Sequence, residues 1–248
     1  MVITYLQGGI GNQLFQIAAS VGYGELYGKQ WRVQSDFKGI DHFNIPQERY
    51  IEEYALPRYK EANFFFENIP FVQSGVQLFG YFQSERYFKL CLNLIRHIFE
   101  CPYKEKISWK YRDQLEKNTV AVHVRRGDYL TLSDHHYNLE KEYYETAIKR
   151  IRLLMSDAFV MCFSDDISWC KKNIPADFFI SDDTFTELHL MSYCKHFIIA
   201  NSSFSWWASW LSTNKEKIVI APPKKKWFGK LKSHYIVDDL YCSNWMHE

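Results

Sequence analysis

The chain has 248 residues, enough for one large domain or for two domains of about 120 residues each. Apolar residues make up 47% of it and aromatic residues 18%, so it can form a substantial hydrophobic core. A formal net charge of +1 excludes a strong overall attraction to nucleic acid. The six cysteines form no Cys-x-x-Cys pair and have no histidine at zinc-site spacing, which favours reduced thiols in an intracellular protein.

No stretch approaches the roughly 20 consecutive apolar residues that a membrane-spanning helix needs. The N-terminus enters a β-rich run without a basic leader, so no signal peptide is expected. We therefore predict a soluble, cytoplasmic protein. Lys224–Lys226 beside Trp227 and Phe228 leave a peripheral membrane contact open, although a solvated run of charges is the favoured interpretation.

The first predicted elements are a strand, a glycine turn and a helix. Val2–Leu6 forms the strand, and Gln7–Gln13 forms the turn. The helix has apolar residues at helical spacing, at Leu14, Ile17, Ala18 and Val21. This order opens a Rossmann-like domain, in which the N-terminus of the helix faces a ligand. The dinucleotide fingerprint fails, because Leu14 stands where its third glycine is required. A turn that only packs the strand on the helix remains the alternative.

The rest of the first half contains fewer regular patterns. Trp31–Ser35 and Val76–Phe82 are predicted strands. Residues 36–74, with three prolines and scattered aromatic residues, are predicted to form irregular loops and short helices on a binding surface. Ser84 is expected to cap a helix that runs to Phe99.

A domain boundary is expected either in the helix 84–99 or in the loop 100–117, where residues 101–106 have the polar, proline-marked composition of a linker. We therefore predict two domains, residues 1–115 and residues 116–248. The last residues of the chain are free to pack back on the first domain.

The middle of the chain combines a buried strand with a cluster of charges. Thr119–Val124 is an apolar, β-branched run, and Arg125, Arg126, Gly127 and Asp128 follow it directly. Ligands of open α/β sheets bind beyond the carboxyl ends of the strands, where this cluster lies. Arginine forks suit phosphate oxygens and keep their charge near neutral pH. The alternative is a strand end with a solvated Arg–Asp pair.

The second half alternates strands and helices, which predicts a parallel sheet with helical crossovers. The later strands are expected at residues 158–163, 177–180, 197–200 and 218–220. Residues 138–155 form an amphipathic helix, and Thr184 with Glu187 fits a capping box at the start of another. Polar clusters follow two of the strands, at residues 164–166 and 201–203.

These strand-end clusters suggest a site for a diphosphate. Two arginines, the helix N-terminus behind Ser202 and Ser203, and backbone donors near Gly11 would form the cradle. The chain has no P-loop lysine, which argues against an ordinary ATPase. It also has no Asp-x-Asp sequence with which to hold a divalent ion, so arginine would have to stabilise a departing diphosphate itself.

Five sequence blocks, which run from residue 8 to residue 207, resemble one known family. They are Gly8-Gly-Ile-Gly-Asn-Gln-Leu-Phe-Gln16, Gly80-Tyr-Phe-Gln-Ser84, His123-Val-Arg-Arg-Gly-Asp-Tyr129, Phe163-Ser-Asp-Asp166 with Trp169, and Leu190–His196 continuing through Ile199–Trp207. Together they resemble the α-1,2-fucosyltransferases, glycosyltransferase family 11. The third block is similar to the donor motif of that family.

The resemblance implies an α/β fold of GT-B type, with two Rossmann-like domains that face each other across a cleft. Residues 1–115 would form the acceptor side and residues 116–248 the donor-binding domain. The implied reaction is inverting, metal-independent transfer of L-fucose from GDP-fucose to the 2-hydroxyl of a galactosyl glycan. The partners would be GDP-fucose and an oligosaccharide or polysaccharide acceptor. No cofactor, no metal and no nucleic acid are expected.

The resemblance also assigns roles to residues. Arg125 is the expected catalytic residue, which holds the diphosphate and stabilises its departure. The expected donor-binding residues are Gly11, Asn12, His123, Arg126, Asp128, Glu187, Asn201, Ser202 and Ser203. Glu187 stands where the family has an aspartate that reads the nucleotide base, so base recognition and helix capping both remain open.

Three further points stay open at this stage. No general base can be selected from the carboxylates and histidine of residues 36–74. Asp165 and Asp166 would either support the arginines or only form a turn. The activity itself has two alternatives, a transferase for a related GDP-deoxysugar and a non-catalytic protein that binds a GDP-sugar or a glycan.

Overall fold

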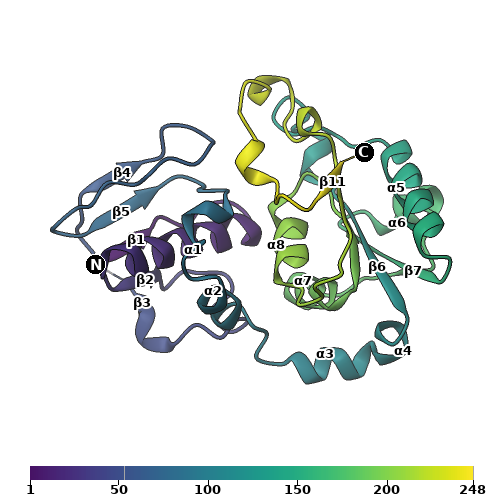
Figure 1. The fold of residues 1–248 in the computed structure, drawn as a ribbon, viewed down its shortest axis with the longest axis horizontal. Helices are drawn as coiled ribbons and strands as arrows, with labels where there is room; N and C mark the ends of the chain where they lie inside the picture. Colours follow the sequence, from purple (N-terminus) through teal and green to yellow (C-terminus); the bar gives the residue numbers. More distant parts are fainter. Residues whose placement is uncertain (53, 248) are drawn as a thin grey trace. The chain divides into compact units, whose positions relative to one another are not determined.

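The computed structural model describes residues 1–52 and 54–247. The chain divides into two compact units, shown with their elements in Figure 1. The first unit contains Met1–Pro102 and Tyr235–Cys242, and the second contains Tyr103–His234 and the residues from Ser243 onward. The predicted domain boundary at residue 115 stays a prediction, because this spatial grouping does not show which parts fold on their own.

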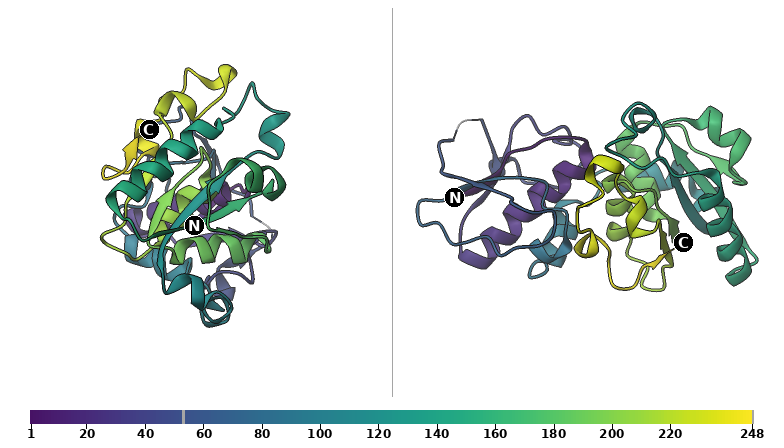
Figure 2. Two further views of the ribbon diagram at one scale, coloured as in Figure 1. Left: turned by 90° about the vertical axis from the view of Figure 1, so that its right-hand side faces the viewer. Right: turned by 90° about the horizontal axis from the view of Figure 1, so that it is seen from above.

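The first unit is built on a sheet of five parallel strands in the order β3-β2-β1-β5-β4. The strands are β1 (Val2–Thr4), β2 (Trp31–Gln34), β3 (Tyr50–Ile51), β4 (Arg58–Lys60) and β5 (Val76–Phe79). Helix α1 (Ile10–Tyr27) packs against β1 and β2, and Figure 2 shows it along its length from above. The predicted strand, glycine turn and helix are therefore confirmed.

Three predictions for the first half need correction, the last being that residues 36–74 contain no strand. The strand expected at Val76–Phe82 ends at Phe79, since the N–H groups of Tyr81 and Phe82 bond the Glu61 carboxylate and Phe82 has a positive φ of 51°. The helix expected from Ser84 is split into a 3₁₀ turn, η2 (Glu85–Tyr87), and helix α2 (Leu92–Ile98). Ser84 does cap η2, but Phe88 N–H and Cys91 N–H bond carbonyls three residues back, so no α-helix passes through them. The short edge strands β3 and β4 lie within the irregular region.

The division between the two units falls between Pro102 and Tyr103, inside the segment 101–106 that was predicted to be a linker, but the second half of that segment is helical. Helices α3 (Lys104–Lys110) and α4 (Arg112–Leu115) occupy this part of the chain. Their apolar residues are few, but Ile107 of α3 is buried, and so is Tyr111, the residue between the two helices, whose Oη donates to Asp182 Oδ2 at 2.7 Å. Tertiary contacts of the second unit therefore stabilise helices whose local sequence has little apolar periodicity.

The second unit has six parallel strands in the order β11-β10-β9-β6-β7-β8. They are β6 (Asn118–Val124), β7 (Ala158–Ser164), β8 (Phe178–Phe179), β9 (His196–Ile198), β10 (Val219–Ala221) and β11 (Met246–His247). The main helices are α5 (Lys141–Leu154), α6 (Ile167–Asn173), α7 (Thr184–Tyr193) and α8 (Ser203–Leu211). Helices α5 and α6 cover one face of the sheet, and α7 and α8 cover the other (Figure 1). The predicted alternation is confirmed, and among the described strands of this unit β11 had not been expected.

Short 3₁₀ turns complete the described elements. They are η1 (Gln47–Arg49), η3 (Asp128–Leu130), η4 (Lys224–Lys226), η5 (Lys230–Lys232) and η6 (Asp238–Leu240). Over the described residues, no helix combines the length and the apolar character needed to cross a membrane.

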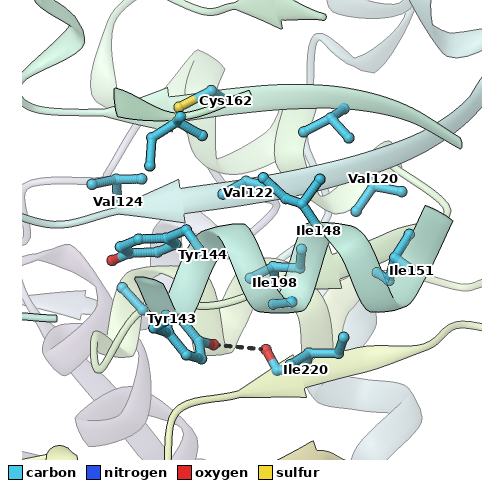
Figure 3. Packing of buried hydrophobic residues seen from close by; sticks show 14 of the residues in the cluster. Val120, Val122, Val124, Tyr143, Tyr144, Ile148, Ile151, Cys162, Ile198 and Ile220 are labelled. Carbon is cyan, nitrogen blue, oxygen red and sulfur yellow. Dashed lines mark hydrogen bonds between the residues drawn. The ribbon is translucent and has the colours of Figure 1, made fainter. Parts of the chain in front are cut away.

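One part of the core of the second unit lies between β6 and α5. Val120, Val122 and Val124 project from the strand onto the apolar face of α5, where Tyr144 and Ile148 are buried (Figure 3). Tyr143 ties the helix to two further strands, because its hydroxyl donates to Ile199 O at 2.7 Å and to Ile220 O at 3.3 Å. This packing fixes the strand whose end carries the two arginines.

Candidate active site

The predicted strand-end clusters lie at one edge of the second sheet. Strands β9, β6 and β7 are neighbours and parallel, and Val124 of β6 pairs with Ser164 of β7. Hydrogen bonds join the segments that follow them. Arg126 N–H donates to Asp165 Oδ1 at 2.9 Å, and Tyr129 Oη donates to Asn201 O at 3.0 Å. The prediction that these three clusters come together is confirmed.

Arg125 is held between two carboxylates. Its Nη2 lies 2.6 Å from Asp128 Oδ1, and its Nη1 lies 2.8 Å from Asp165 Oδ2. The guanidinium carbon lies 5.5 Å from the centre of the Tyr129 ring. The side chain keeps 34% of its surface exposed, so an anion can still reach it. Burial raises the pKa of the Tyr144 hydroxyl on α5, and its hydrogen bond with the Arg125 backbone opposes that shift.

Arg126 has a more enclosed environment. Its Nε lies 3.2 Å from Asp166 Oδ2, and its guanidinium carbon lies 3.9 Å from the centre of the Trp169 ring. Asp166 also caps α6, because its Oδ1 accepts a hydrogen bond from Trp169 N–H at 3.0 Å. The question of what Asp165 and Asp166 do is therefore answered, since both support the arginines.

Gly127 makes this arrangement possible. A Cβ atom at Gly127 would lie 2.5 Å from Asp165 Oδ2, a distance that no real side chain tolerates. Asp165 can therefore bind Arg125 and the Arg126 backbone only because position 127 has no side chain. The three carboxylates of Asp128, Asp165 and Asp166 also offset the positive charge of the two arginines. A diphosphate would therefore have to share or replace the contacts of these carboxylates with the arginines.

His123 is a neutral, buried ring next to this cluster. Burial and the positive charge of Arg125 lower the pKa of His123 to about 3. Its ring centre lies 5.3 Å from that of Phe204, and its Nδ1 atom has no hydrogen-bond partner. A neutral imidazole can donate or accept a hydrogen bond, but it cannot serve as a cation near neutral pH.

Asn201, Ser202 and Ser203 lie at the start of α8. The Asn201 amide donates to Tyr137 O and Trp227 O at 2.9 Å each, so it ties two loops together. Ser202 is the N-cap residue, and its Oγ accepts a hydrogen bond from Phe204 N–H at 3.3 Å. Ser203 is the first residue of the helix, where backbone donors and the helix dipole favour an anion.

Glu187 lies near the same edge, on α7. Its Oε1 accepts a hydrogen bond from Asp182 N–H at 3.0 Å. Burial raises the pKa of Glu187 to about 7, and the charges of Asp182, Asp183 and Asp165 add to the shift. The predicted cap at Thr184 is wrong by one residue, because Asp183 Oδ1 accepts hydrogen bonds from Phe185 N–H and Thr186 N–H at 3.0 Å. The choice between base reader and helix support stays open.

In the first unit, Gly11 and Asn12 lie in the first turn of α1. Gly9 is the N-cap residue, and the preceding Gly8 has a φ of 77°. Asn12 N–H bonds Gly9 O at 3.0 Å, and its side-chain Oδ1 accepts a hydrogen bond from Gln83 Nε2 at 2.7 Å. The sequence blocks singled out both segments, but only the structure reveals their side-chain contact.

The sequence alone did not single out Tyr129 and Trp169 as supports of the arginines. Both lie inside blocks of the resemblance, and aromatic rings within a few residues of paired arginines were the available signal. Within residues 1–52 and 54–247, no group of three or more His, Cys, Asp or Glu side chains is arranged to hold a metal ion.

The fold is similar to that of GT-B-like fucosyltransferases. The solved structure of the NodZ alpha-1,6-fucosyltransferase soaked with GDP-fucose superposes with a TM-score of 0.62 and 14% identity. The match covers 91% of this chain and 95% of that one. At this level of identity the likeness establishes the fold.

Sequence comparison then gives the family. The chain belongs to glycosyl transferase family 11, whose family model matches residues 43–248. The O-antigen biosynthesis glycosyltransferase WbnK of Escherichia coli is 30% identical, over 94% of this chain and 97% of that protein. An alpha-1,2-colitosyltransferase of Escherichia coli is 31% identical, over 93% of each. A galactoside 2-alpha-L-fucosyltransferase of Caenorhabditis elegans is 32% identical over 56% of this chain and 43% of that protein. The protein is a glycosyltransferase.

Proposed function

We propose that the protein transfers L-fucose from GDP-fucose to the 2-hydroxyl of a galactosyl residue in a glycan, with inversion at the anomeric carbon. The observation that carries this proposal is Arg125, a partly exposed guanidinium held by Asp128 and Asp165 at the end of β6. Membership of glycosyl transferase family 11 supports the reaction class. The names of two relatives, one a colitosyltransferase and one a fucosyltransferase, support the α-1,2 linkage.

In the proposed reaction, the acceptor oxygen forms a bond to the anomeric carbon from the face opposite the diphosphate. The bond between that carbon and the diphosphate oxygen breaks, and GDP leaves with the electron pair. The acceptor hydroxyl gives its proton to a base, either a protein side chain or a phosphate oxygen. The negative charge that develops on GDP is what the enzyme must stabilise.

Arg125 is suited to that task because its carboxylate partners fix the plane of its guanidinium before the donor binds. A group oriented in advance does not have to reorganise during the reaction. Ser202 and Ser203 would add the N-terminal donors of α8 as phosphate ligands, with Asn201 supporting their loop. His123 would offer a neutral hydrogen-bonding ring, and Asp128 would orient Arg125 at the nucleotide end. Arg126 would assist mainly by holding the turn after β6 in place, through its contacts with Asp165 and Asp166.

Two further groups are assigned to donor binding on the basis of the family resemblance. Glu187 would contact the nucleotide base, and its raised pKa of about 7 would let it either donate or accept a hydrogen bond. Gly11 and Asn12 would contribute the first turn of α1. No cofactor takes part in this scheme, and the arginines take over the electrostatic role of a divalent ion.

A second donor remains a specific alternative, because one relative is named a colitosyltransferase. The experiment that decides is a donor panel. The purified protein is incubated with a β-galactosyl acceptor and GDP-fucose, GDP-colitose or GDP-mannose, and the product linkage is determined by NMR. We expect the highest kcat/KM with GDP-fucose and attachment at O2. Preferred use of GDP-colitose would correct the donor, and attachment at another oxygen would overturn the proposed linkage.

We also propose that the protein contacts an anionic membrane surface from its second unit. Loop hydrogen bonds join Gly229 N–H to His135 O at 3.0 Å and Leu231 N–H to Asp134 O at 2.8 Å. They join the segment of Leu231 to the loop that follows Leu130 and Leu132, and all three leucines are exposed. Lys230 and Lys232 flank Leu231 in the sequence. Exposed apolar groups among lysines suit the interface of an acidic lipid bilayer.

Vesicle sedimentation tests this contact. We expect more protein to bind vesicles that contain phosphatidylglycerol than vesicles of phosphatidylcholine alone. The combined variant Lys230→Glu and Leu231→Ser should lose this preference while it keeps transfer to a soluble acceptor. Equal binding to the two kinds of vesicle by the unmodified protein would overturn the proposal.

A further inference from the structure

Glu61 binds a neighbouring loop through both of its carboxylate oxygens. It follows strand β4, and its own N–H donates to Phe79 O at 2.9 Å. Its Oε2 accepts a hydrogen bond from Tyr81 N–H at 2.7 Å, and its Oε1 accepts one from Phe82 N–H at 3.0 Å. Burial raises the pKa of Glu61 to about 7. Keeping a carboxylate in such a place costs solvation energy, which the two backbone donors partly offset.

The loop that Glu61 binds has an unusual backbone. Phe82 has a φ of 51°. Among the residues that the structure describes, no other non-glycine residue has a positive φ. Such a conformation costs roughly 1 kcal/mol or more for a side chain of this size. Gly80 must lack a side chain, because a Cβ atom there would lie 2.5 Å from Glu61 Oε2. Gln16 Nε2 donates to Gly80 O at 3.0 Å and joins the loop to α1.

This backbone directs Gln83 toward the first turn of α1. Gln83 is 8% exposed, and its Nε2 donates to Asn12 Oδ1 at 2.7 Å. An amide has one acceptor end and one donor end, so this hydrogen bond fixes which way the Asn12 side chain faces. The Asn12 Nδ2 lies over Gly8, where a Cβ atom would approach it to 2.6 Å.

We infer that Glu61 and Gln83 are positioning residues, which hold the Asn12 amide in the orientation that donor binding requires. Glu61 acts through the loop 80–82, and Gln83 acts by direct contact. The inference rests on the proposed function, because it takes Asn12 as a donor-binding residue. It assigns a task to two residues that contact no substrate themselves, and it explains why a partly buried carboxylate is retained beside a strained turn.

The experiment combines a double-mutant cycle with a matched control. Gln83→Glu keeps the side-chain length but cannot donate to Asn12 Oδ1, and Glu61→Gln keeps the shape but turns an amide group toward one backbone donor. We expect each to lower kcat/KM for GDP-fucose about five- to tenfold, as for the loss of one hydrogen bond. Combined with Asn12→Ala, neither should cause a further loss. The control Gln77→Glu changes a glutamine that is 7% exposed, and it should leave kcat/KM unchanged.

A second measurement does not depend on activity. The side-chain amide NMR signal of Asn12, identified by its loss in Asn12→Ala, should shift in Gln83→Glu and in Glu61→Gln but not in Gln77→Glu. An unshifted signal in the first two variants would overturn the inference. Losses of activity that multiply in the double mutants would overturn it as well.

Other results would contradict the proposed function and not the orienting roles of Glu61 and Gln83. Normal activity of Asn12→Ala would remove Asn12 from donor binding and, with it, the functional part of the inference. No turnover of GDP-fucose by the unmodified protein would overturn the proposed donor, while the NMR shifts would still decide whether Glu61 and Gln83 orient Asn12.

Discussion

The two arginines after β6 differ in what surrounds them. The Arg125 side chain is 34% exposed, whereas that of Arg126 is 20% exposed and lies against the Trp169 ring. Both are paired with aspartates, but Arg125 has more surface that a phosphate can approach. The residue-scale geometry therefore favours Arg125 as the contact to the leaving group and Arg126 as part of its support.

Asp165 is the residue on which this arrangement depends most. Asp165→Asn would weaken the contacts to Arg125 Nη1 and to Arg126 N–H, because an amide group has one acceptor oxygen. We expect a loss of about tenfold or more in kcat/KM, since hydrogen bonds to charged groups contribute about 1.5–3 kcal/mol. The measurement is steady-state transfer from GDP-fucose.

Asp177→Asn provides the matched control for that variant. Asp177 Oδ2 also binds an arginine, Arg152 at 3.1 Å, and a backbone donor, Val160 N–H at 2.8 Å. Its contacts lie at the start of β7, away from the strand ends that carry the arginines. We expect Asp177→Asn to change stability but not kcat/KM, and equal loss of activity in both variants would refute a specific role for Asp165.

Glu187 gives a pH-dependent prediction. Its folded-state pKa of about 7 lies above the ordinary 4.5, so the folded protein binds this proton more tightly than the unfolded chain. The resulting stabilisation is fully present below about pH 4.5 and is lost as the pH rises through 7. In urea unfolding between pH 5 and pH 8, Glu187→Gln should therefore show a smaller fall in the free energy of unfolding. Parallel curves for the two proteins would contradict this.

The sequence could identify Arg125, Arg126 and Asp128, because chemistry-bearing residues directly after a buried strand are visible in a single stretch. It could not assign their partners. Asp165 is adjacent to Arg125 only through the register between β6 and β7, which sets Val124 beside Ser164. The protonation of Glu187 was equally invisible, because it depends on burial and on aspartates that the fold brings near.

Elements whose apolar residues recur at a regular spacing were predicted, and elements that depend on tertiary contacts were not. Helix α5 was predicted because its apolar positions recur at helical spacing and face β6. Helix α3 was missed, since its helical state depends on contacts such as that between Tyr111 and Asp182. The predicted cap at Thr184 fits the capping-box spacing, but the side chain of Asp183 satisfies the free N–H groups instead.

The correction at α7 can be tested by stability. Asp183→Ala removes an acceptor for two backbone N–H groups and should lower the free energy of unfolding by about 1 kcal/mol. Thr184→Ala leaves that cap intact and should change the free energy by much less. Chemical unfolding of the two variants is the measurement. A larger loss in Thr184→Ala than in Asp183→Ala would restore Thr184 as the cap.

At the scale of the whole molecule, the sequence predicted two α/β units with parallel sheets. The central strands of both sheets were found because buried β-branched runs are continuous along the chain. The edge strands β3, β4 and β11 were missed, because two or three residues are too few to show a period. These strands form because they pair with strands that are distant in the sequence, and the local sequence pattern carries no information about that pairing.

We also predict that transfer needs no divalent metal. The aspartate pairs are already engaged, since Asp165 and Asp166 bind arginines and Asp182 binds Lys110 and Tyr111. GDP release should therefore proceed at an unchanged rate in excess EDTA with GDP-fucose and an acceptor. Loss of activity that magnesium or manganese restores would refute an arginine-only mechanism.

The central claim is that Arg125 stabilises the departing diphosphate, and the turnover of Arg125 variants tests it most directly. We predict that Arg125→Ala lowers kcat with GDP-fucose at least about 100-fold, in line with the loss of one transition-state contact. Arg125→Lys should also be impaired, because a point charge does not reproduce the planar fork. Arg152→Ala, which breaks another Arg–Asp pair in the same unit, should keep normal turnover. Near-normal kcat in a folded Arg125→Ala protein would contradict the account.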